Sequence, residues 1–513
     1  MMESFLGDWL GRRAQLSPDR TALFDAAHDM RPISYRDWNS AAGRAAAFLH
    51  GLGVAKGERV AVLAYNEVAF LDLWFACGKL GAILQPLNWR LTVAELVALL
   101  ADAEPLVLVY GPEFAPTVSE LRGRAPSVRH WIALDAATRA APDDLPLAEC
   151  DDLQPHAIPT ALSPHDPWVI CYTGGTTGIP KGAILTHGSI TANAVNTVAS
   201  WGLDQHDVAI LNAPLFHTGG MNVFTAPLVL AGGSSVVCRN FNADQVYDLI
   251  GGGMVTLFFG VPTMFIALQQ HARWEHADFS RLKLVISGGA PCPMPVFQRF
   301  WARSVDFKTG YGLTEAGPNT FWLPPAEVHR KPGAVGYPLF FIDARVVDDH
   351  GAECGSGTVG ELQIRGSHVC AGYWRRPEET ARTFVDGWLH TGDLASYDAD
   401  GCYTIVGRLK EVIISGGENI YPAEVESVLA AHPAVAEAAL IAAPDPRWGE
   451  VGWAVVVPCD SNLQPDDLLN FANAKLARYK LPRRVIITDT LPKTAAGKID
   501  KIALTQQFVP AKA

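Results

Sequence analysis

Tyr172-Thr-Gly-Gly-Thr-Thr-Gly-Ile-Pro-Lys-Gly182 is the most informative stretch of this sequence. It follows the apolar run 168–172, which predicts a buried strand that opens into a loop rich in glycine and threonine. Glycines let backbone N–H groups approach an anion, threonine hydroxyls add donors, and Lys181 adds a positive charge. The loop therefore predicts a phosphate cradle. It is not a Walker A loop, because Pro180 precedes the lysine and Gly182 follows it.

Around this loop, the chain alternates short apolar runs with longer helical patterns. Residues 59–64 and 106–110 predict strands, and residues 67–82 predict a helix with apolar side chains at spacings of three and four. This alternation is typical of parallel α/β units, so we predict an α/β fold class. Six prolines fall within residues 140–167, which predicts a surface linker rather than part of the core.

The C-terminal part of the sequence has a different pattern. Short alternating runs predict an antiparallel β region with strands at residues 344–347, 360–365, 403–406 and 411–414. Two later helices are predicted to begin at Pro422 and Pro465, because proline suits the first turn and acidic residues follow it. The residues beyond about 408 therefore predict a small α+β domain of roughly 100 residues.

One glycine motif within this β region needs a different interpretation. Gly355-Ser-Gly-Thr-Val-Gly360 fits the dinucleotide-binding pattern, but it leads into a predicted strand. It thus lacks the helix N-terminus on which a pyrophosphate binds. We expect a hairpin connection there.

The composition excludes several classes of protein. The chain has 513 residues, of which 49% are hydrophobic and 18% are charged, so it is long enough for two domains and too apolar to be disordered. Nine cysteines without a Cys-x-x-Cys pair argue against a disulfide framework and favour the reducing cytoplasm. Residues 1–20 do not predict a secretory signal. Glycines and prolines interrupt the uncharged stretch 208–238, so no transmembrane segment is expected.

The charge is divided unevenly along the chain. Residues 1–407 carry the whole net charge of −12, whereas residues 408–513 hold 12 basic and 12 acidic side chains. Within the second part, the window 475–501 holds eight basic residues against two acidic ones. This window predicts either a solvated surface or one that contacts phosphates. Nucleic acid is not an expected partner, because the remainder is acidic and few aromatic residues accompany the basic ones.

Four further segments follow the phosphate loop in a characteristic order. They are Gly310-Tyr-Gly-Leu-Thr-Glu-Ala-Gly317, Thr391-Gly-Asp-Leu394, Gly407-Arg-Leu-Lys-Glu411 with Ser415-Gly-Gly-Glu-Asn-Ile-Tyr-Pro422, and Pro492-Lys-Thr-Ala-Ala-Gly-Lys498. Together with the loop, they resemble the adenylate-forming (ANL) superfamily over nearly the whole chain. Within that superfamily, the sequence is most similar to AMP-dependent acyl-CoA synthetases of the fatty-acyl and the 4-coumarate or feruloyl type.

The resemblance implies how the α/β chain is divided. A large N-terminal adenylation domain, residues 1–406, would contain two stacked α/β subdomains and a small β-barrel-like region. Residues 407–410 would form a hinge that includes Lys410. Residues 411–513 would form a small, mobile α+β lid domain that alternates between two positions.

The resemblance also implies a two-step ligase reaction that uses ATP, Mg²⁺ and coenzyme A. A fatty acid of medium or long chain, or an aromatic acid, would attack the α-phosphate of ATP and give acyl-adenylate and pyrophosphate. The thiol of coenzyme A would then displace AMP. The sequence leaves the acid, the pathway and the oligomeric state open, with a homodimer as one option.

The residues carried over from the family fall into four groups. The catalytic group is Lys498, Glu315, Thr314 and His217. The metal group is Thr173 and Glu315. The acid-binding group is His217, Gly219, Gly220, Gly260, Gly288, Gly312 and Pro318. The group for the nucleotide and coenzyme A is Thr173, Gly174, Gly175, Thr176, Thr177, Lys181, Gly289, Ala290, Pro291, Gly310, Tyr311, Gly312, Asp393, Arg408, Lys410, Gly416, Gly417, Trp448, Tyr479 and Arg483.

Individual roles follow from the same resemblance. Lys498 would bridge the acyl carboxylate and the α-phosphate, and Glu315 would associate with magnesium. Tyr311 would stack on adenine, while Asp393 would accept the ribose hydroxyls. These residue types suit a reaction in which negative charge gathers on phosphoryl oxygens.

The acid pocket allows two substrate classes. His217 would be its gate residue, and the small Gly219 and Gly220 predict a channel open to a long or bulky acyl chain. The segment Gly317-Pro-Asn319 instead resembles the coumarate-type enzymes. Two other functions remain as alternatives: an adenylating enzyme that loads a carrier protein or stops at acyl-AMP, and a catalytically silent binding protein on the same scaffold.

Overall fold

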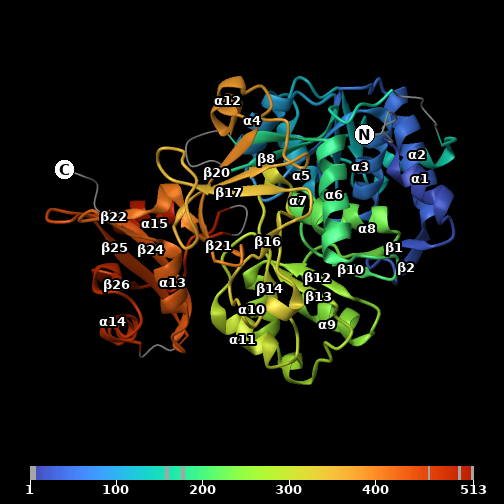
Figure 1. The fold of residues 1–513 in the computed structure, drawn as a ribbon. Helices are drawn as coiled ribbons and strands as arrows, with labels where there is room; N and C mark the ends of the chain where they lie inside the picture. Colours follow the sequence, from blue (N-terminus) through green and yellow to red (C-terminus); the bar gives the residue numbers. More distant parts are fainter. Residues whose placement is uncertain (1–6, 156–160, 175–179, 460–462, 495–497, 510–513) are drawn as a thin grey trace.

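The computed structural model describes residues 7–155, 161–174, 180–459, 463–494 and 498–509. Two seven-stranded sheets form most of the body (Figure 1), a smaller antiparallel sheet packs beside them, and a fourth sheet belongs to the C-terminal part. This architecture confirms the predicted α/β class with two stacked units, a small β region and a C-terminal α+β unit. The domain limits 1–406, 407–410 and 411–513 stay predictions.

The first sheet contains the predicted phosphate loop. Its strand order is β7-β6-β5-β3-β4-β8-β9, and all neighbours are parallel except β8 and β9. The bounds are β3 (Arg59–Leu63), β4 (Ile83–Pro86), β5 (Val107–Tyr110), β6 (His130–Ala133), β7 (Leu145–Pro146), β8 (Pro167–Thr173) and β9 (Lys181–Thr186). The parallel strands are buried on both faces, so they form continuous apolar runs.

The second sheet has the order β14-β13-β12-β10-β11-β1-β2. The bounds are β1 (Thr21–Asp25), β2 (Arg31–Ser34), β10 (Val208–Leu211), β11 (Ser234–Val237), β12 (Leu257–Gly260), β13 (Leu284–Ser287) and β14 (Lys308–Thr309). Strand β1 pairs in parallel with β11, with Leu23 opposite Ser235. The N-terminal hairpin therefore completes a sheet whose other strands come from residues 208–309.

The two remaining sheets are mainly antiparallel. The body sheet contains β17 (Asp343–Val347), β18 (Gly360–Arg365), β19 (Phe384–Val385), β20 (Trp388–Tyr397) and β21 (Tyr403–Arg408), beside the pair β15 (Phe321–Trp322) and β16 (Tyr337–Pro338). The C-terminal sheet contains β22 (Ile413–Ser415), β23 (Glu418–Ile420), β24 (Val435–Asp445), β25 (Gly449–Pro458) and β26 (Arg484–Ile487). Strands β17 and β18 are antiparallel, which confirms the expected hairpin at 355–360.

Helices cover both faces of the large sheets. Those of the body are α1 (Trp9–Leu16), α2 (Tyr35–Gly51), α3 (Val68–Leu80), α4 (Val93–Ala103), α5 (Ala115–Leu121), α6 (His187–Trp201), α7 (Thr218–Gly220), α8 (Ala226–Ala231), α9 (Ala243–Gly251), α10 (Pro262–Gln270), α11 (Met294–Trp301) and α12 (Pro377–Thr383). Helices α2 and α3 share one core with Val60 and Val62, while α4 and α5 share another with Ala61 and Leu63. Alternate residues of β3 thus supply two separate cores.

The C-terminal unit lies to one side of the body, where Figure 1 shows it at the left. Its helices are α13 (Pro422–Ala430), α14 (Pro465–Asn473) and α15 (Lys501–Phe508). Helices α13 and α14 share one core with β24 and β25, and α15 packs in a second cluster with them. The helices expected at Pro422 and Pro465 are both confirmed.

The prediction of a surface linker at 140–167 is wrong in part. Asp144 is only 2% exposed. It accepts a hydrogen bond from the Tyr110 hydroxyl at 2.5 Å, and it forms an ion pair with Arg122. Leu145–Pro146 forms β7 at the sheet edge. A buried carboxylate with partners distant in sequence fixes this part of the segment to the core.

The strand predicted at 411–414 is shifted, because the 3₁₀ turn Leu409–Glu411 occupies its start and β22 runs from Ile413 to Ser415. Residues 208–238 form β10, α7, α8 and β11. Over the described ranges, no helix has the length and apolarity that crossing a bilayer requires. All nine cysteine thiols are free.

Three buried histidines should make the fold sensitive to acid. Burial lowers the pKa of His187, His217 and His368 from 6.5 to about 4. Below pH 6.5 the unfolded chain binds protons that the folded chain does not, so this stability is fully present above pH 6.5 and is lost as the pH falls towards 4. Each shift corresponds to about 3 kcal/mol at most. We expect the melting temperature to fall steadily from pH 6.5 to 5, above the range where ordinary carboxylates titrate.

His368→Gln supplies the matched variant for this experiment. Both ring nitrogens of His368 are buried without a partner among the described residues, so removal of the imidazole should flatten the profile by about a third. A wild-type melting temperature that is equal at pH 5 and pH 7 would contradict the expectation.

Candidate active site

The phosphate loop connects the last two strands of the first sheet. Thr173 ends β8 and lies opposite Lys181, the first residue of β9, and its hydroxyl donates to the Lys181 carbonyl at 3.3 Å. The two ends of the loop are therefore held together by the hairpin. Gly174 follows Thr173, whereas Gly175, Thr176 and Thr177 lie outside the described residues.

Lys181 and Glu315 both contact the side chain of Tyr373. The Lys181 ammonium lies 5.0 Å from the centre of the Tyr373 ring, and the Tyr373 hydroxyl donates to Glu315 Oε1 at 2.9 Å. Glu315 and Thr314 belong to a short 3₁₀ turn, Thr314–Ala316, after β14. The predicted phosphate lysine and metal carboxylate thus belong to one connected cluster. The sequence did not indicate Tyr373.

Tyr311, Asp393 and Arg408 form a second cluster. The Tyr311 hydroxyl donates to Asp393 Oδ2 at 2.5 Å, and Arg408 Nε lies 2.6 Å from Asp393 Oδ1. Strands β20 and β21 place Asp393 opposite Arg408. Burial raises the pKa of Asp393, although the Arg408 charge opposes this shift. The arrangement holds a buried carboxylate beside a planar aromatic ring, which suits a ribose and an attached base.

Three parallel strands end together at the edge of this site. The Gly288 N–H donates to the Gly260 carbonyl at 3.0 Å, and the Gly310 N–H donates to the Ser287 carbonyl at 2.8 Å. The segments after β12, β13 and β14 therefore leave the sheet side by side, and the next residues in line are Gly289, Ala290, Pro291, Tyr311 and Gly312. Ligands of open α/β sheets bind at such carboxyl edges.

Lys498 approaches both clusters from the C-terminal unit. Burial and the neighbouring Arg408 lower the pKa of Lys498, while the carboxylates of Asp393, Glu411 and Glu315 oppose the shift. The Thr494 N–H donates to the Lys498 carbonyl at 2.7 Å, next to the antiparallel bridge of Lys493 with Ile499. Part of Lys498 is exposed to solvent, so that a ligand can reach it, although enough protein surrounds the ammonium to lower its pKa. The charges of Arg408, Asp393 and Glu315 therefore all act on the Lys498 ammonium, which relates the C-terminal unit to both clusters.

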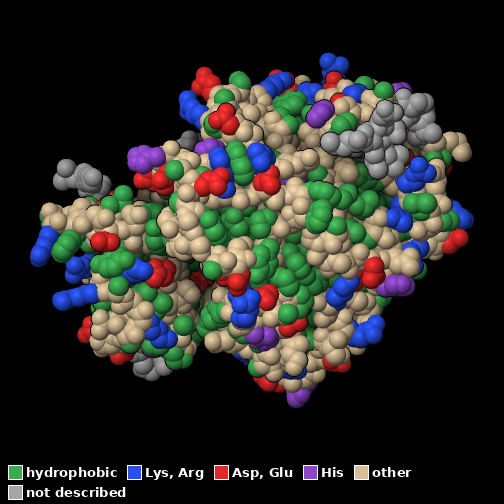
Figure 2. Space-filling view, viewed as in Figure 1, with side chains coloured by type: hydrophobic (Ala, Val, Ile, Leu, Met, Phe, Trp, Pro, Cys, Tyr) green, Lys and Arg blue, Asp and Glu red, His purple; other side chains and the backbone are tan. Residues whose placement is uncertain are grey.

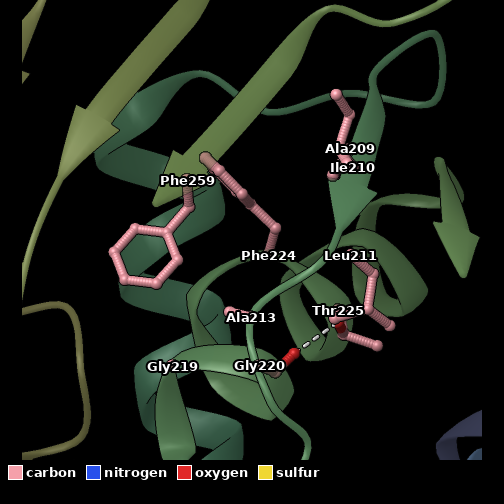
Figure 3. A pocket seen from close by; sticks show the side chains of 9 residues that line it. All are labelled: Ala209, Ile210, Leu211, Ala213, Gly219, Gly220, Phe224, Thr225 and Phe259. Carbon is pink, nitrogen blue, oxygen red and sulfur yellow. Dashed lines mark hydrogen bonds between the residues drawn. The ribbon is translucent and has the colours of Figure 1, made fainter. Parts of the chain in front are cut away.

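A pocket lies beside the predicted acid-binding glycines Gly219 and Gly220 (Figure 3). Its lining comes from β10, α7, the Met221–Thr225 turn and β12, and it includes Gly219, Gly220, Phe224 and Phe259. A Cβ added to Gly219 would lie 3.2 Å from the Phe259 ring, and one added to Gly288 would lie 2.9 Å from it. The Phe259 ring therefore fills the space that these two glycines leave.

Two other glycines of the predicted acid site serve backbone packing. A Cβ on Gly220 would lie 2.4 Å from the Pro214 carbonyl oxygen, and a Cβ on Gly312 would lie 2.2 Å from that of Pro318. At Gly260 the nearest atoms belong to Phe265, at 3.1 Å. The inference that Gly219 and Gly220 leave a channel open for a long chain does not follow from this packing, because protein atoms occupy the space.

His217 directly precedes α7, one of the elements that line this pocket, and it is a neutral imidazole at pH 7. Burial, followed by the charges of Lys498 and Arg90, lowers its pKa to about 4. Its Nε2 is buried and has no partner among the described residues. A neutral ring with one free nitrogen can donate to, or accept from, a bound acyl group.

The remaining predicted contacts lie on the C-terminal unit. The Gly416 N–H donates to the Trp448 carbonyl at 2.8 Å, and a Cβ on Gly416 would lie 2.5 Å from the Trp448 ring. The guanidinium groups of Arg447 and Arg483 lie 4.8 and 5.9 Å from that ring. Gly417 adopts a φ of +89° with open space around it. These residues make a cationic aromatic surface.

Two other predicted contact residues, Tyr479 and Lys410, have different neighbours from the residues of that surface. Tyr479 is exposed, with Lys480 5.7 Å from its ring. Lys410 lies in the 3₁₀ turn Leu409–Glu411 between β21 and β22. Figure 2 shows Lys and Arg side chains gathered along the outer edge of the C-terminal unit.

Comparison with known proteins identifies related sequences over the whole chain. The family model for AMP-binding enzymes matches residues 10–374, and the model for the AMP-binding enzyme C-terminal domain matches residues 424–498. The chain is 42% identical to a feruloyl-CoA synthase of Amycolatopsis sp over 509 residues, 99% of this chain and 100% of the relative. It is 34% identical to the long-chain-fatty-acid–CoA ligase FadD13 of Mycobacterium tuberculosis over 511 residues, 98% of each.

A solved structure is similar to this chain over nearly its whole length. ATP-bound MatB from Rhodopseudomonas palustris superposes with a TM-score of 0.89 at 32% identity, and the match covers 98% of this chain and 99% of that one.

Proposed function

Since this chain belongs to the family of AMP-binding enzymes and is an ATP-dependent, AMP-forming acid:CoA ligase, we propose that its acid is aromatic. In the first step, a carboxylate oxygen of the acid forms a bond to the α-phosphorus of ATP, and pyrophosphate leaves. In the second step, the sulfur of coenzyme A bonds to the acyl carbon and AMP leaves. Magnesium enters with ATP as part of the substrate and neutralises phosphate charge.

Each cluster has a proposed part in the first step. Asp393 would accept the ribose hydroxyls, and Lys181 would bind the outer phosphates. Glu315 would hold the magnesium that accompanies them. Lys498 would place its ammonium between the acid and the α-phosphate, where negative charge develops. The charges are positioned beforehand by protein contacts, so little reorganisation is needed at the moment of reaction.

The observation that carries the choice of acid is the Phe259 ring, which is enclosed by Gly219 and Gly288. A flat aromatic acid can stack beside this ring, since such contacts favour offset or edge-to-face geometry. A long flexible chain would have to displace it. The relative at 42% identity is named a feruloyl-CoA synthase, and the one at 34% a fatty-acid ligase, which supports the same choice.

The cationic aromatic surface supports coenzyme A as the acceptor. Arginines that stack on a tryptophan can bind an adenine ring and phosphate groups together. A carrier protein would present a phosphopantetheine without the nucleotide, so it would not need such a surface.

Pyrophosphate exchange across a panel of acids tests the proposal. We expect exchange with cinnamates and arylacetates to exceed exchange with fatty acids of 8 to 16 carbons by roughly tenfold or more, the range that pocket shape supplies. Phe259→Ala should raise KM for the aromatic acid about tenfold and improve the fatty acids. Phe340→Ala, which removes a ring that is 80% exposed, is the matched control and should change neither.

Two outcomes would count against the proposal. A wild-type preference for fatty acids would refute the aromatic substrate, and transfer to a carrier protein in preference to CoA would refute the acceptor. Absence of exchange with every acid would favour the silent binding protein.

Location and assembly form the last part of the proposal. Free thiols at all nine cysteines are consistent with the reducing cytoplasm. The homodimer suggested as one option from the sequence would be measured by sedimentation.

A further inference from the structure

Tyr373 is the residue that joins the phosphate lysine to the metal carboxylate. Its ring receives the Lys181 ammonium at 5.0 Å, and its hydroxyl donates to Glu315 Oε1 at 2.9 Å. The residue is 9% exposed. A phenol that binds a cation through its face and an anion through its hydroxyl can hold both charges at fixed positions.

The backbone around Tyr373 is fastened to the same two elements. On one side, Ile184 N–H donates to the Gly372 carbonyl at 2.9 Å, and Trp374 N–H donates to the Gly182 carbonyl at 2.7 Å. Both partners belong to β9, the strand that begins at Lys181. On the other side, Cys370 N–H donates to the Glu315 carbonyl at 2.7 Å. Segment 370–374 therefore connects the two elements by backbone and side chain.

A third contact fixes the position of Tyr373 itself. Its N–H donates to Thr380 Oγ1 at 2.9 Å, and a Cβ on Gly372 would lie 2.5 Å from the Thr380 methyl group. The tyrosine is thus anchored in the body, independently of the C-terminal unit. Its hydroxyl donates to Oε1 of Glu315, and no residue within the described ranges donates to Oε2, which leaves that oxygen for a cation.

We propose that Tyr373 is a positioning residue that holds Lys181 and Glu315, before ATP arrives, at the separation required by the outer phosphates and their magnesium. Without it, opposite charges in one site would be free to pair with each other instead of with the ligand. The proposal rests on the function proposed above, and it assigns to Tyr373 an effect on metal-nucleotide binding but none on the acid or on coenzyme A.

Tyr373→Phe separates the two contacts, because it keeps the ring beneath Lys181 and removes only the hydroxyl. The probe is Mn²⁺, followed by electron paramagnetic resonance, with an ATP analogue whose α,β-bridging oxygen is replaced by methylene. We expect Mn²⁺ binding to weaken about tenfold, the size of one hydrogen bond to a charged group. Tyr373→Leu also removes the ring, so it should weaken binding of the metal-free nucleotide as well.

Tyr397→Phe is the matched control. That tyrosine donates to the Cys354 carbonyl at 2.7 Å on β20, away from both charges, and its loss should leave Mn²⁺ binding unchanged. Thioester formation from supplied acyl-AMP should be unchanged in Tyr373→Phe.

Two results would overturn the inference. One is wild-type Mn²⁺ binding in Tyr373→Phe. The other is an equal loss of both half-reactions together with a lower melting temperature, which would mark a merely structural role. The Mn²⁺ binding assay needs no turnover, so it tests the role of Tyr373 even if the proposed ligase activity is wrong. Pyrophosphate exchange by the wild-type protein tests the ligase activity separately.

Discussion

Lys498→Ala is expected to lower acyl-adenylate formation by about 100- to 1,000-fold and to leave thioester formation from supplied acyl-AMP nearly intact. The lysine faces the charges of Arg408, Asp393 and Glu315. These charges support its proposed position between the acid carboxylate and the α-phosphate. Loss of one group that stabilises developing charge has effects of this size. Pyrophosphate exchange measures the first step, and CoA-dependent release of AMP from acyl-AMP measures the second.

Lys493→Ala provides the control on the same segment. Lys493 pairs with Glu437 at 2.6 Å on the C-terminal unit, and its removal should affect neither step. If Lys498→Ala slowed both half-reactions to the same extent, the assignment of Lys498 to adenylation would be wrong.

Asp393→Ala should lower kcat/KM for ATP by at least about 100-fold. The side chain is 4% exposed, and both oxygens are engaged, one by Tyr311 and one by Arg408. Its loss would remove two charge-assisted contacts to the ribose and would release the Tyr311 ring, and each such contact contributes about 1.5–3 kcal/mol. The ATP dependence of exchange at saturating acid measures the effect.

Asp343→Ala tests whether any carboxylate on this sheet would behave the same way. Asp343 pairs with Arg365 at 2.8 Å, and both side chains are more than half exposed, so we expect no change in kcat/KM. A normal KM for ATP in Asp393→Ala would refute the ribose assignment. The melting temperature of both variants shows whether the fold is intact.

The sequence could predict the parts of this site whose residues are neighbours in the chain or lie on adjacent strands. The strand before the phosphate loop, the loop itself and Lys181 are adjacent in the chain, and the β8–β9 hairpin keeps them together. Asp393 and Arg408 are likewise joined by neighbouring antiparallel strands. The motifs around them could be recognised because short segments carry both the structure and the chemistry.

The parts that sequence could not predict depend on distant packing. Tyr373 meets Glu315 across 58 residues, and its only sequence signal is a Gly-Tyr-Trp triplet that indicates no partner. Phe259 fills the space beside Gly219 and Gly288, whereas sequence reveals a missing side chain but not what replaces it. For the same reason, the burial of Asp144 could not be predicted from its proline-rich segment, because its partners Tyr110 and Arg122 are distant in sequence.

The pairing of β1 with β11 imposes an order on synthesis of the protein. Strand β1 emerges from the ribosome before its partner β11, because Ser235, which pairs with Leu23, is more than 200 residues further along the chain. At roughly 5–20 residues per second, the first strand waits on the order of 10–40 s for its partner. Strands β3 to β9 can form the first sheet in this interval, whereas β1 and β2 cannot join the second sheet until β11 has been made. The N-terminal hairpin therefore needs protection from premature association while its partner strand is being made.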